Sequence, residues 1–295
     1  MHRTLLLISL CLLATTTHAG SGAWSGHVDL VNKYYVRGIT TTYGNLPTGF
    51  GNRYADAPES DKATLQWGLD YSHDSGWYAG YWGSQVNFSY DLIGKAYDQY
   101  VRTGTVSIDD YQDGPNSLEH DLYAGYRGQA GDLGYEVGLI GYLYSHSRHS
   151  AGMETKLGVS YRGFSLAAQT LVNDAVWGNQ GDTYWTLAYS HALPHDLTLT
   201  GTLGAYTYAK EGKYIGTRDP RTGTDCPPGT AFFITGCVAG SGPVGGGFRH
   251  FTLALSQPIG DSGFTWSLQA ILGGDNRWGM AQGERLMASL SYQIK

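Results

Sequence analysis

Charged side chains recur on one face of a series of short alternating segments, and their types are those that could do chemistry. Acids and bases occur together, so they could line a water-filled path and set its selectivity. They could equally pair across a closed interior and fill it, and the near balance of signs fits both arrangements. The set comprises Asp29, Lys33, Arg37, Asp70, Glu119, Asp121, Arg127, Glu136, Glu154, Lys156, Asp182 and Arg285.

Catalytic groups are sparse in the remaining sequence. The run Ser-His-Ser-Arg-His at positions 145–149 contains the residue types of a hydrolase site at a barrel rim. Histidine is also common in polar loops, and we favour that interpretation of this run. We therefore expect no catalytic residues and no enzyme activity.

Metal and cofactor sites are not indicated either. His146 with His149, or His191 with His195, would each need a third ligand that is not in register. The acidic stretch 109–114 resembles a calcium loop, but Tyr111 occupies a position that needs an Asp or Asn ligand, and the twelfth position lacks a Glu. We expect a solvated acidic loop, with no metal and no cofactor.

The elements that must position the charged residues are best seen in the stretch 63–88. Ala63, Leu65, Trp67, Leu69 and Tyr71 alternate with polar residues and glycine, which predicts a strand with one apolar face. The tripeptide at 74–76, Asp-Ser-Gly, predicts a tight turn into a second strand. About ten residues at a tilt of about 45° would cross a bilayer core. The stretch is therefore typical of one hairpin of a transmembrane β-barrel.

The rest of the chain repeats this unit. Twelve alternating segments can be identified, and an even number of strands leaves both termini on the same side. On any wall that faces lipid, a charge near the midplane would cost about 2–4 kcal/mol, so the charged faces are expected to point inward. The segments are 24–38, the two halves of 63–88, 118–128, 133–144, 153–161, 164–172, 182–191, 197–208, 249–257, 264–273 and 284–295.

The connections alternate in length, as they do in outer-membrane barrels with short periplasmic turns and longer outer loops. The longer set is 39–62, 89–117, 145–152, 173–181, 209–248 and 274–283, and the shorter set is 74–76, 129–132, 162–163, 192–196 and 258–263. Aromatic residues lie beside the short turns, where a girdle at the periplasmic interface is expected. They are Tyr71, Trp77, Tyr126, Tyr135, Tyr161, Phe164, Tyr189 and Phe264.

Composition and the N-terminus agree with export. Only 15% of the 295 residues are charged, the formal net charge is −6, and no basic stripe suggests nucleic acid. Residues 1–19 combine a basic start, an apolar run and a small-residue site, so we expect a signal peptide, followed by a single barrel domain at 20–295. Cys226 and Cys237 then remain in one Gly/Pro-rich segment, and we expect a disulfide between them.

The bore of such a barrel can be estimated. Twelve strands give a backbone diameter of roughly 24 Å, and side chains leave roughly 12 Å. Glycines at inward positions, such as Gly68, Gly125 and Gly204, are expected to widen the bore locally. The connection 209–248 is long enough to fold into it. Glu119, Asp121, Lys33 and Lys156 are the charges expected nearest the narrowest part.

Four stretches carry a family resemblance: 28–40 (VDLVNKYYVRGIT), 67–88 (WGLDYSHDSGWYAGYWGSQVNF), 119–128 (EHDLYAGYRG) and 131–138 (GDLGYEVG). Through them the chain resembles the TorF family of porins, also called Gcw_chp proteins. The match is specific in the N-terminal half and extends to the C-terminal half by pattern only. The resemblance implies an outer-membrane β-barrel of Gram-negative bacteria with channel activity, and it supplies no catalytic residues.

We therefore expect an outer-membrane porin that forms a diffusion channel for small hydrophilic solutes. Its partners would be outer-membrane lipid, those solutes and the barrel assembly machinery, although the chain ends Tyr-Gln-Ile-Lys rather than on an aromatic residue. A non-conducting barrel that binds partners through its long loops is the main alternative, and an outer-membrane enzyme is a further one. Neither a specific solute nor an oligomeric state is indicated.

Overall fold

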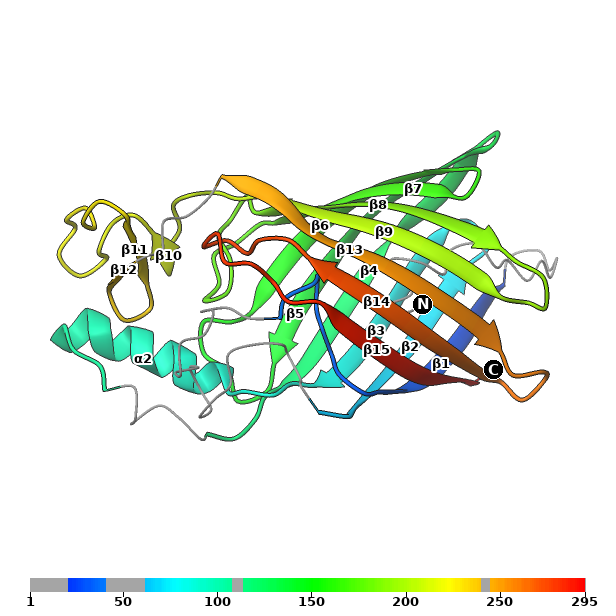
Figure 1. Ribbon diagram of the computed structural model, residues 1–295, viewed down its shortest axis with the longest axis horizontal. Coiled ribbons are helices and arrows are strands. Elements are labelled where there is room, and N and C mark those ends of the chain that lie inside the picture. The colour runs from blue at the N-terminus through cyan, green and yellow to red at the C-terminus, as the bar shows by residue number, and fades with distance from the viewer. Residues whose placement is uncertain (1–20, 41–61, 108–113, 240–244, 295) are drawn as a thin grey trace.

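The computed structural model describes residues 21–40, 62–107, 114–239 and 245–294. The expected signal peptide lies outside the described residues, as do residues 109–113 of the stretch that resembles a calcium loop. Within the described residues, no helix has the length and hydrophobicity that a membrane crossing requires. The dominant feature is a barrel with long connections gathered at one end (Figure 1).

The expected fold class is confirmed, because twelve antiparallel strands form a closed barrel. Each strand pairs with its sequence neighbour in the barrel, and β1 closes the ring against β15. The strands are β1 (Gly22–Val31), β2 (Thr64–His73), β3 (Trp77–Gln85), β4 (Leu118–Ala130), β5 (Leu133–Tyr144), β6 (Gly152–Tyr161), β7 (Phe164–Leu171), β8 (Thr183–Ala192), β9 (Thr198–Thr207), β13 (Gly246–Pro258), β14 (Phe264–Gly273) and β15 (Arg285–Ile294).

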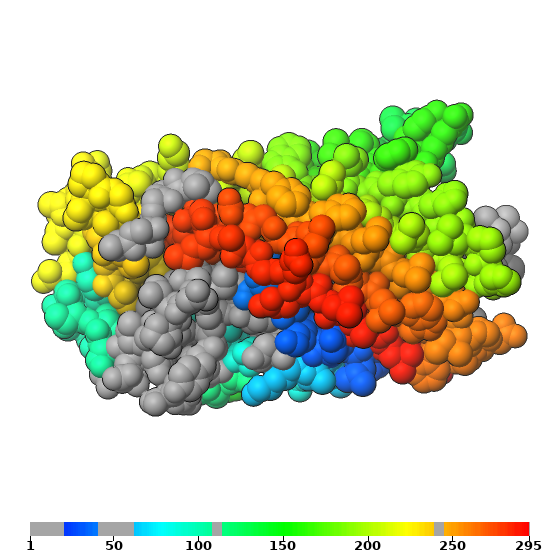
Figure 2. Space-filling model, viewed as in Figure 1, coloured from blue at the N-terminus to red at the C-terminus, as the bar shows by residue number. Residues whose placement is uncertain are grey.

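The wall separates apolar and polar side chains, as the period of two requires. On β6, Leu157 is 58% exposed on the outside, whereas Glu154 and Lys156 are buried on the inside. The same alternation runs through the other strands, so a band of exposed Leu, Val and aromatic residues surrounds the barrel. In Figure 2, strands β13–β15 and β1 form one continuous wall that extends away from the loop-rich end.

Aromatic residues form the expected girdle beside the short turns. Rings from neighbouring strands pack together there, with centroid distances of 5.0 Å for Trp24 and Tyr71, and 5.4 Å for Trp77 and Tyr126. Phe264 and Tyr292 make the corresponding pair on β14 and β15, at 4.9 Å. These rings mark one rim of the apolar band.

Three of the inward glycines, Gly68, Gly125 and Gly204, do not widen the bore as we expected, because a neighbouring ring occupies the space above each of them. A Cβ on Gly68 would meet the imidazole of His27, and one on Gly204 would meet His250. The ring of Tyr78 covers Gly125 in the same way. Glycine at these positions lets a large side chain lie flat against the inner wall.

One expectation about the strand bounds is wrong. The first strand ends at Val31 rather than at position 38, and residues 32–40 leave the wall. The connection after β9 is long enough to fold into the bore, but its described part builds a separate three-stranded sheet. This sheet comprises β10 (Ile215–Gly216), β11 (Thr230–Phe233) and β12 (Cys237–Ala239).

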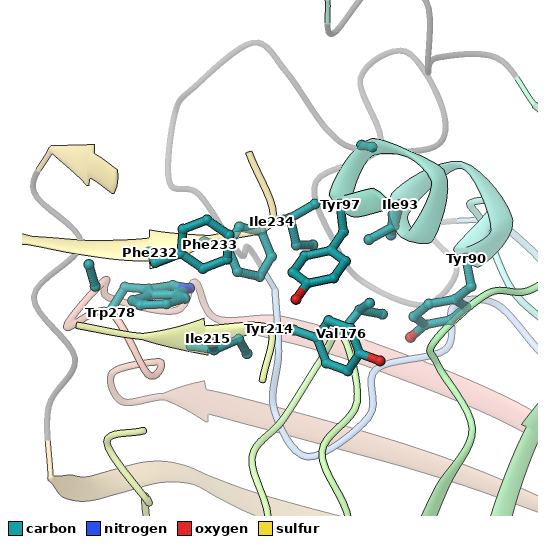
Figure 3. Packing of buried hydrophobic residues seen from close by; sticks show 12 residues of the cluster. Tyr90, Ile93, Tyr97, Val176, Tyr214, Ile215, Phe232, Phe233, Ile234 and Trp278 are labelled. Atoms are coloured by element: carbon teal, nitrogen blue, oxygen red, sulfur yellow. The ribbon is translucent and has the colours of Figure 1, made fainter. Parts of the chain in front are cut away.

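This small sheet and the helix α2 (Tyr90–Thr103) lie beyond the long-loop end of the barrel, and we call them the cap (Figure 1). The cap has its own apolar core, in which Tyr97 of α2 packs against Tyr214 and Phe232 (Figure 3). Trp278, from the connection after β14, packs on Phe233. The cap is therefore a packed unit built from several connections.

Cys226 and Cys237 are bonded within the cap, with Cα atoms 5.6 Å apart. The disulfide ties β12 to the chain segment between β10 and β11. In the chain-entropy description, a ring of this length is worth about 2–3 kcal/mol. That energy stabilises the cap rather than the wall.

The helix α2 is fixed at both ends and along one side. The Ser89 hydroxyl accepts a hydrogen bond from the Leu92 amide, and Gly104 ends the helix with a φ of 77°. Along its side, the Asp98 carboxylate contacts Nε2 of His149 at 2.7 Å and Nη1 of Arg148 at 3.2 Å. These contacts dock α2 onto the connection after β5.

The docking of α2 should weaken in acid. Burial acts to raise the pKa of Asp98, but the hydrogen bonds and charges of His149 and Arg148 outweigh it and lower the pKa below 3.8. Because the folded-state pKa is depressed, the contribution is present above pH 3.8 and is lost as the pH falls through the lowered value. We expect amide exchange in α2, corrected for its intrinsic pH dependence, to accelerate below pH 3.8 while the barrel strands stay protected.

Asp98→Asn should exchange faster already at neutral pH and show no further acid step. Asp132→Asn removes an exposed acid that pairs with Arg162 at a short turn, and it serves as the matched control. Equal α2 protection above and below the transition in the unmodified protein would contradict this prediction.

Candidate functional site

Residues 32–40, which follow β1, cross the interior of the barrel, and we call them the inner segment. Near its start, the Tyr34 hydroxyl donates to Oε2 of Glu119 at 3.1 Å, and the Tyr34 ring packs on Trp82 with centroids 5.6 Å apart. Near its end, the Thr40 amide donates to Oε1 of Gln282 at 2.7 Å. The inner segment is therefore held on both sides of the bore.

The tip of the inner segment reaches the far wall through Arg37. Its Nη1 and Nη2 donate to the two carboxylate oxygens of Glu154 on β6, at 2.8 and 2.6 Å. Nη1 also donates to the Tyr206 hydroxyl at 2.8 Å, and Nη2 donates to the Tyr142 hydroxyl at 3.1 Å. The guanidinium lies 4.7 Å from the ring centroid of Tyr184. One side chain thus bridges from the end of β1 to β5, β6, β8 and β9.

The backbone at this tip adopts an uncommon conformation. Arg37 has a φ of 50°, in the left-handed region, which costs a non-glycine residue about 1–3 kcal/mol. Gly38 follows with a φ of 71°, and a Cβ there would come within 2.6 Å of the Cβ of His250. The contacts of Arg37 offset this cost, so the turn is built to place its guanidinium against Glu154.

A cavity of about 680 Å³ lies in the bore on the short-turn side of the inner segment. Tyr34, Tyr35 and Arg37 form part of its lining at one end, and residues of the short turns, such as Asp132 and Arg162, line the other. The volume suits a solute of the size of a small sugar. The polar interior is therefore partly hollow and is not filled throughout by paired side chains.

One wall of this cavity carries a group of three charges. The Glu136 carboxylate accepts from Nη2 of Arg127 at 3.1 Å and from Nζ of Lys156 at 2.9 Å. The Tyr78 hydroxyl donates to the same carboxylate at 2.7 Å, and its ring lies 3.8 Å from the guanidinium of Arg127. Two cations and one anion are thus fixed at the cavity surface.

Four predicted acids lie on β1, β2 and β4, and all are buried on the inner face. Asp29 contacts Nδ1 of His27 at 2.8 Å, and Asp70 accepts from the Tyr123 hydroxyl at 2.6 Å. Glu119 accepts from Tyr34, and Asp121 lies two positions further along β4. None of the four lines the cavity described above.

The remaining predicted residues occupy different places. Lys33 is in the inner segment, half-buried, and does not line the cavity. Arg285 is exposed at the long-loop rim, where its Nε donates to the Tyr35 hydroxyl at 3.2 Å. Asp182 is buried just before β8 and pairs with Arg277. The structure therefore brings Arg37, Arg127, Glu136 and Lys156 together around the cavity and leaves the other predicted charges outside its lining.

Two buried arginines were missed by the sequence patterns. Arg249 is in β13 and Arg277 is in the connection after β14, and they are 3% and 7% exposed. The sequence position of Arg249, at the edge of an alternating segment, was a signal that could have been used. A β-bulge between Phe248 and His250 shifts the register of β13 here, so the alternation of inward and outward side chains is interrupted at Arg249. Arg277 lies in a loop, where no periodicity indicates a direction.

The polar run at 145–149 has a structural role in this arrangement. His149 contacts Asp98 of α2, as described above, and the Ser147 hydroxyl donates to the Tyr144 carbonyl oxygen at 2.6 Å. Across the described ranges, no group of three or more His, Cys, Asp or Glu side chains is arranged to hold a metal ion.

A family profile described as "Bacterial protein of unknown function (Gcw_chp)" matches residues 16–225, which is more than half of the chain. The chain belongs to the Gcw_chp family. The matched region includes the inner segment, the opening hairpin and the strands that carry Glu136, Glu154 and Lys156, so the crossing of the bore lies within the part that defines this Gcw_chp protein. No curated protein matches the sequence.

Solved barrels are similar in shape at low sequence identity. The KdgM porin has 7% identity and a TM-score of 0.46, with 92% of this chain and 98% of that chain covered. OprD of Pseudomonas aeruginosa has 12% identity and a TM-score of 0.38, with 80% and 62% covered. The outer membrane phospholipase A of Escherichia coli has 10% identity and a TM-score of 0.39, with 94% and 99% covered.

Proposed function

We propose that this Gcw_chp protein is an outer-membrane porin that forms a diffusion channel for small hydrophilic solutes and whose bore is narrowed by the inner segment. The observation that carries the proposal is the polar cavity of about 680 Å³ inside a closed barrel. A barrel interior with hydrophilic space and fixed charges is the arrangement that lets polar solutes pass while charge selects among them.

The exterior supports a membrane location. Leu122, Leu139 and Leu157 are each half-exposed or more on the wall, and a girdle of aromatic rings borders the band that they belong to. Exposing such an apolar band to water is unfavourable in free energy, whereas contact with outer-membrane lipid is not. The resemblance to the TorF family of porins is part of this proposal, as are export by a signal peptide and insertion by the barrel assembly machinery in a Gram-negative bacterium.

We further propose that transport needs no catalytic step. The side chains that could have suggested hydrolysis are engaged in holding the cap, since His149 contacts Asp98 and Ser147 donates to a backbone carbonyl oxygen. The charged groups that face the cavity are arranged as ion pairs, with Glu136 between Arg127 and Lys156. Such pairs suit the positioning of a passing solute.

Conductance in planar bilayers tests this proposal directly. The protein, folded into lipid, should give discrete current steps in potassium chloride, and proteoliposomes should swell in small sugars but not in large dextrans. A barrel that is folded by gel mobility but gives neither steps nor swelling, including when the inner segment is released as described in the Discussion, would favour a surface-binding role through the cap.

A further inference from the structure

The guanidinium of Arg249 is buried on the inner side of β13 without a carboxylate partner among the described residues. Its Nε donates to the carbonyl oxygen of Arg37 at 3.2 Å, and its Nη1 donates to the carbonyl oxygen of Asp275 at 3.1 Å. The ring centroid of Tyr206 lies 5.9 Å from the guanidinium carbon. A charge that is only 3% exposed and is met by neutral acceptors alone is costly.

Its surroundings add positive charge rather than balance it. The guanidinium carbon of Arg37 also lies 5.9 Å from the ring centroid of Tyr206. The ring of Tyr206 stacks on that of Tyr208, with centroids 4.9 Å apart, and the guanidinium carbon of Arg277 lies 4.7 Å from the Tyr208 centroid. Arg37 pairs with Glu154, and Arg277 pairs with Asp182. Three guanidiniums along these two rings therefore have two carboxylates, which leaves one positive charge uncompensated.

Arg277 contributes a second unsatisfied group. Its Nη2 pairs with Asp182, but its Nη1 is buried and has no hydrogen-bond partner. Buried donors are normally satisfied, so an unsatisfied one calls for a physical reason. This donor lies beside Tyr208, whose ring stacks on Tyr206, the ring nearest Arg249.

We propose that Arg249, assisted by Nη1 of Arg277, is a binding site for a small carboxylate-bearing solute, and that the site opens when the inner segment moves away. The inference rests on the proposed channel function and names its solute class. A monocarboxylate matches the single uncompensated charge, and its two oxygens fit the fork of a guanidinium. In the observed arrangement the Arg37 carbonyl oxygen occupies the Nε donor of Arg249, so solute and inner segment compete for the same group.

This competition couples binding to opening. A ligand that binds only the open arrangement shifts the population toward it by the factor 1 + [L]/Kd. At a solute concentration of about ten times Kd, the open population therefore rises about elevenfold relative to the closed one. The solute would release the segment that narrows its own path.

Cysteine labelling at Thr40 tests the site without using conduction. Thr40 is 5% exposed and accepts a hydrogen bond from the Gly283 amide at 2.6 Å, so Thr40→Cys is shielded while the inner segment is in place. Cys226 and Cys237 are bonded and do not compete for a maleimide. The labelling rate of the folded protein is measured in sodium acetate, sodium phosphate and sodium chloride at equal ionic strength.

Acetate should accelerate labelling several-fold over chloride, and Arg249→Gln in the Thr40→Cys background should abolish the difference. Arg249→Lys keeps the charge but lacks the two-pronged guanidinium, so it should lose most of the difference in labelling rate between acetate and chloride. This variant provides the test if the glutamine variant does not fold. Arg218→Gln, at an exposed position between β10 and β11 that does not line the cavity, should keep the full acetate response.

Equal rates in acetate and chloride, or an acetate response that survives Arg249→Gln, would overturn the site. An acceleration by phosphate as large as that by acetate would overturn the carboxylate class. Because labelling does not depend on current, acetate-dependent labelling of a barrel that never conducts would refute the channel function and leave the site standing.

Discussion

Replacing Arg37 with methionine is expected to raise the time-averaged conductance of the barrel by at least tenfold. The substitution removes the bidentate contact with Glu154 and leaves that carboxylate, which is 1% exposed, buried without its partner. Removing one member of a buried pair costs about 3–5 kcal/mol, and this cost falls on the arrangement in which the inner segment crosses the bore. Since about 1.4 kcal/mol changes a ratio tenfold, the closed-to-open ratio should fall by about 10² or more.

Single-channel recording in planar bilayers measures this effect as open probability and step size. Glu154→Gln keeps the volume of the side chain and removes the other member of the pair, so it should act in the same direction. The double variant should resemble the stronger single variant, because both remove one interaction. Arg218→Met, at an exposed position between β10 and β11 that does not line the cavity, is the matched control and should conduct like the unmodified protein. Unchanged currents in both single variants would mean that the inner segment does not limit the path.

Introducing arginine at Leu157 is expected to destabilise the folded barrel by about 2–4 kcal/mol in lipid. Leu157 lies at the middle of β6, is 58% exposed and pairs with Val137 and Ala168 on the neighbouring strands, so its side chain faces outward at mid-wall. A guanidinium there would enter the hydrocarbon region without a partner. Urea titration of the protein folded in phospholipid vesicles, followed by tryptophan fluorescence, measures the change.

Leu286→Arg provides the control for depth. Leu286 is 68% exposed and follows the first residue of β15, at the long-loop rim, where the same substitution should cost about 0–1 kcal/mol. If the two variants lose equal stability, or if Leu157→Arg is as stable as the unmodified protein, the wall does not contact lipid at this depth.

The barrel could be predicted from the sequence because its information is local. Alternation on a strand such as β5 (Leu133–Tyr144) sets which residues face outward, and the short turns fix each pairing, so the observed bounds of β5 and β14 agree with the expected segments. The same locality explains the girdle, since a residue such as Trp77 needs only to flank a turn.

The inner segment could not be predicted in the same way. Val36 continues the alternation of β1, so the pattern indicated a longer strand, yet the chain leaves the wall after Val31. The reason is a set of contacts that are distant in sequence, from Arg37 to Glu154, Tyr142 and Tyr206. Alternation along the sequence carries no information about such long-range contacts. The buried arginines Arg249 and Arg277 were missed for the same reason.

The cap also constrains the order in which the protein can fold. Its apolar core draws Tyr97 from α2, Val176 from the connection after β7, Phe232 from β11 and Trp278 from the connection after β14. Pairing of the barrel strands brings the ends of these connections together. Closing the connections into the cap then costs little additional conformational entropy. We therefore expect the cap to be completed last, after the slow, non-local strand pairing of the barrel.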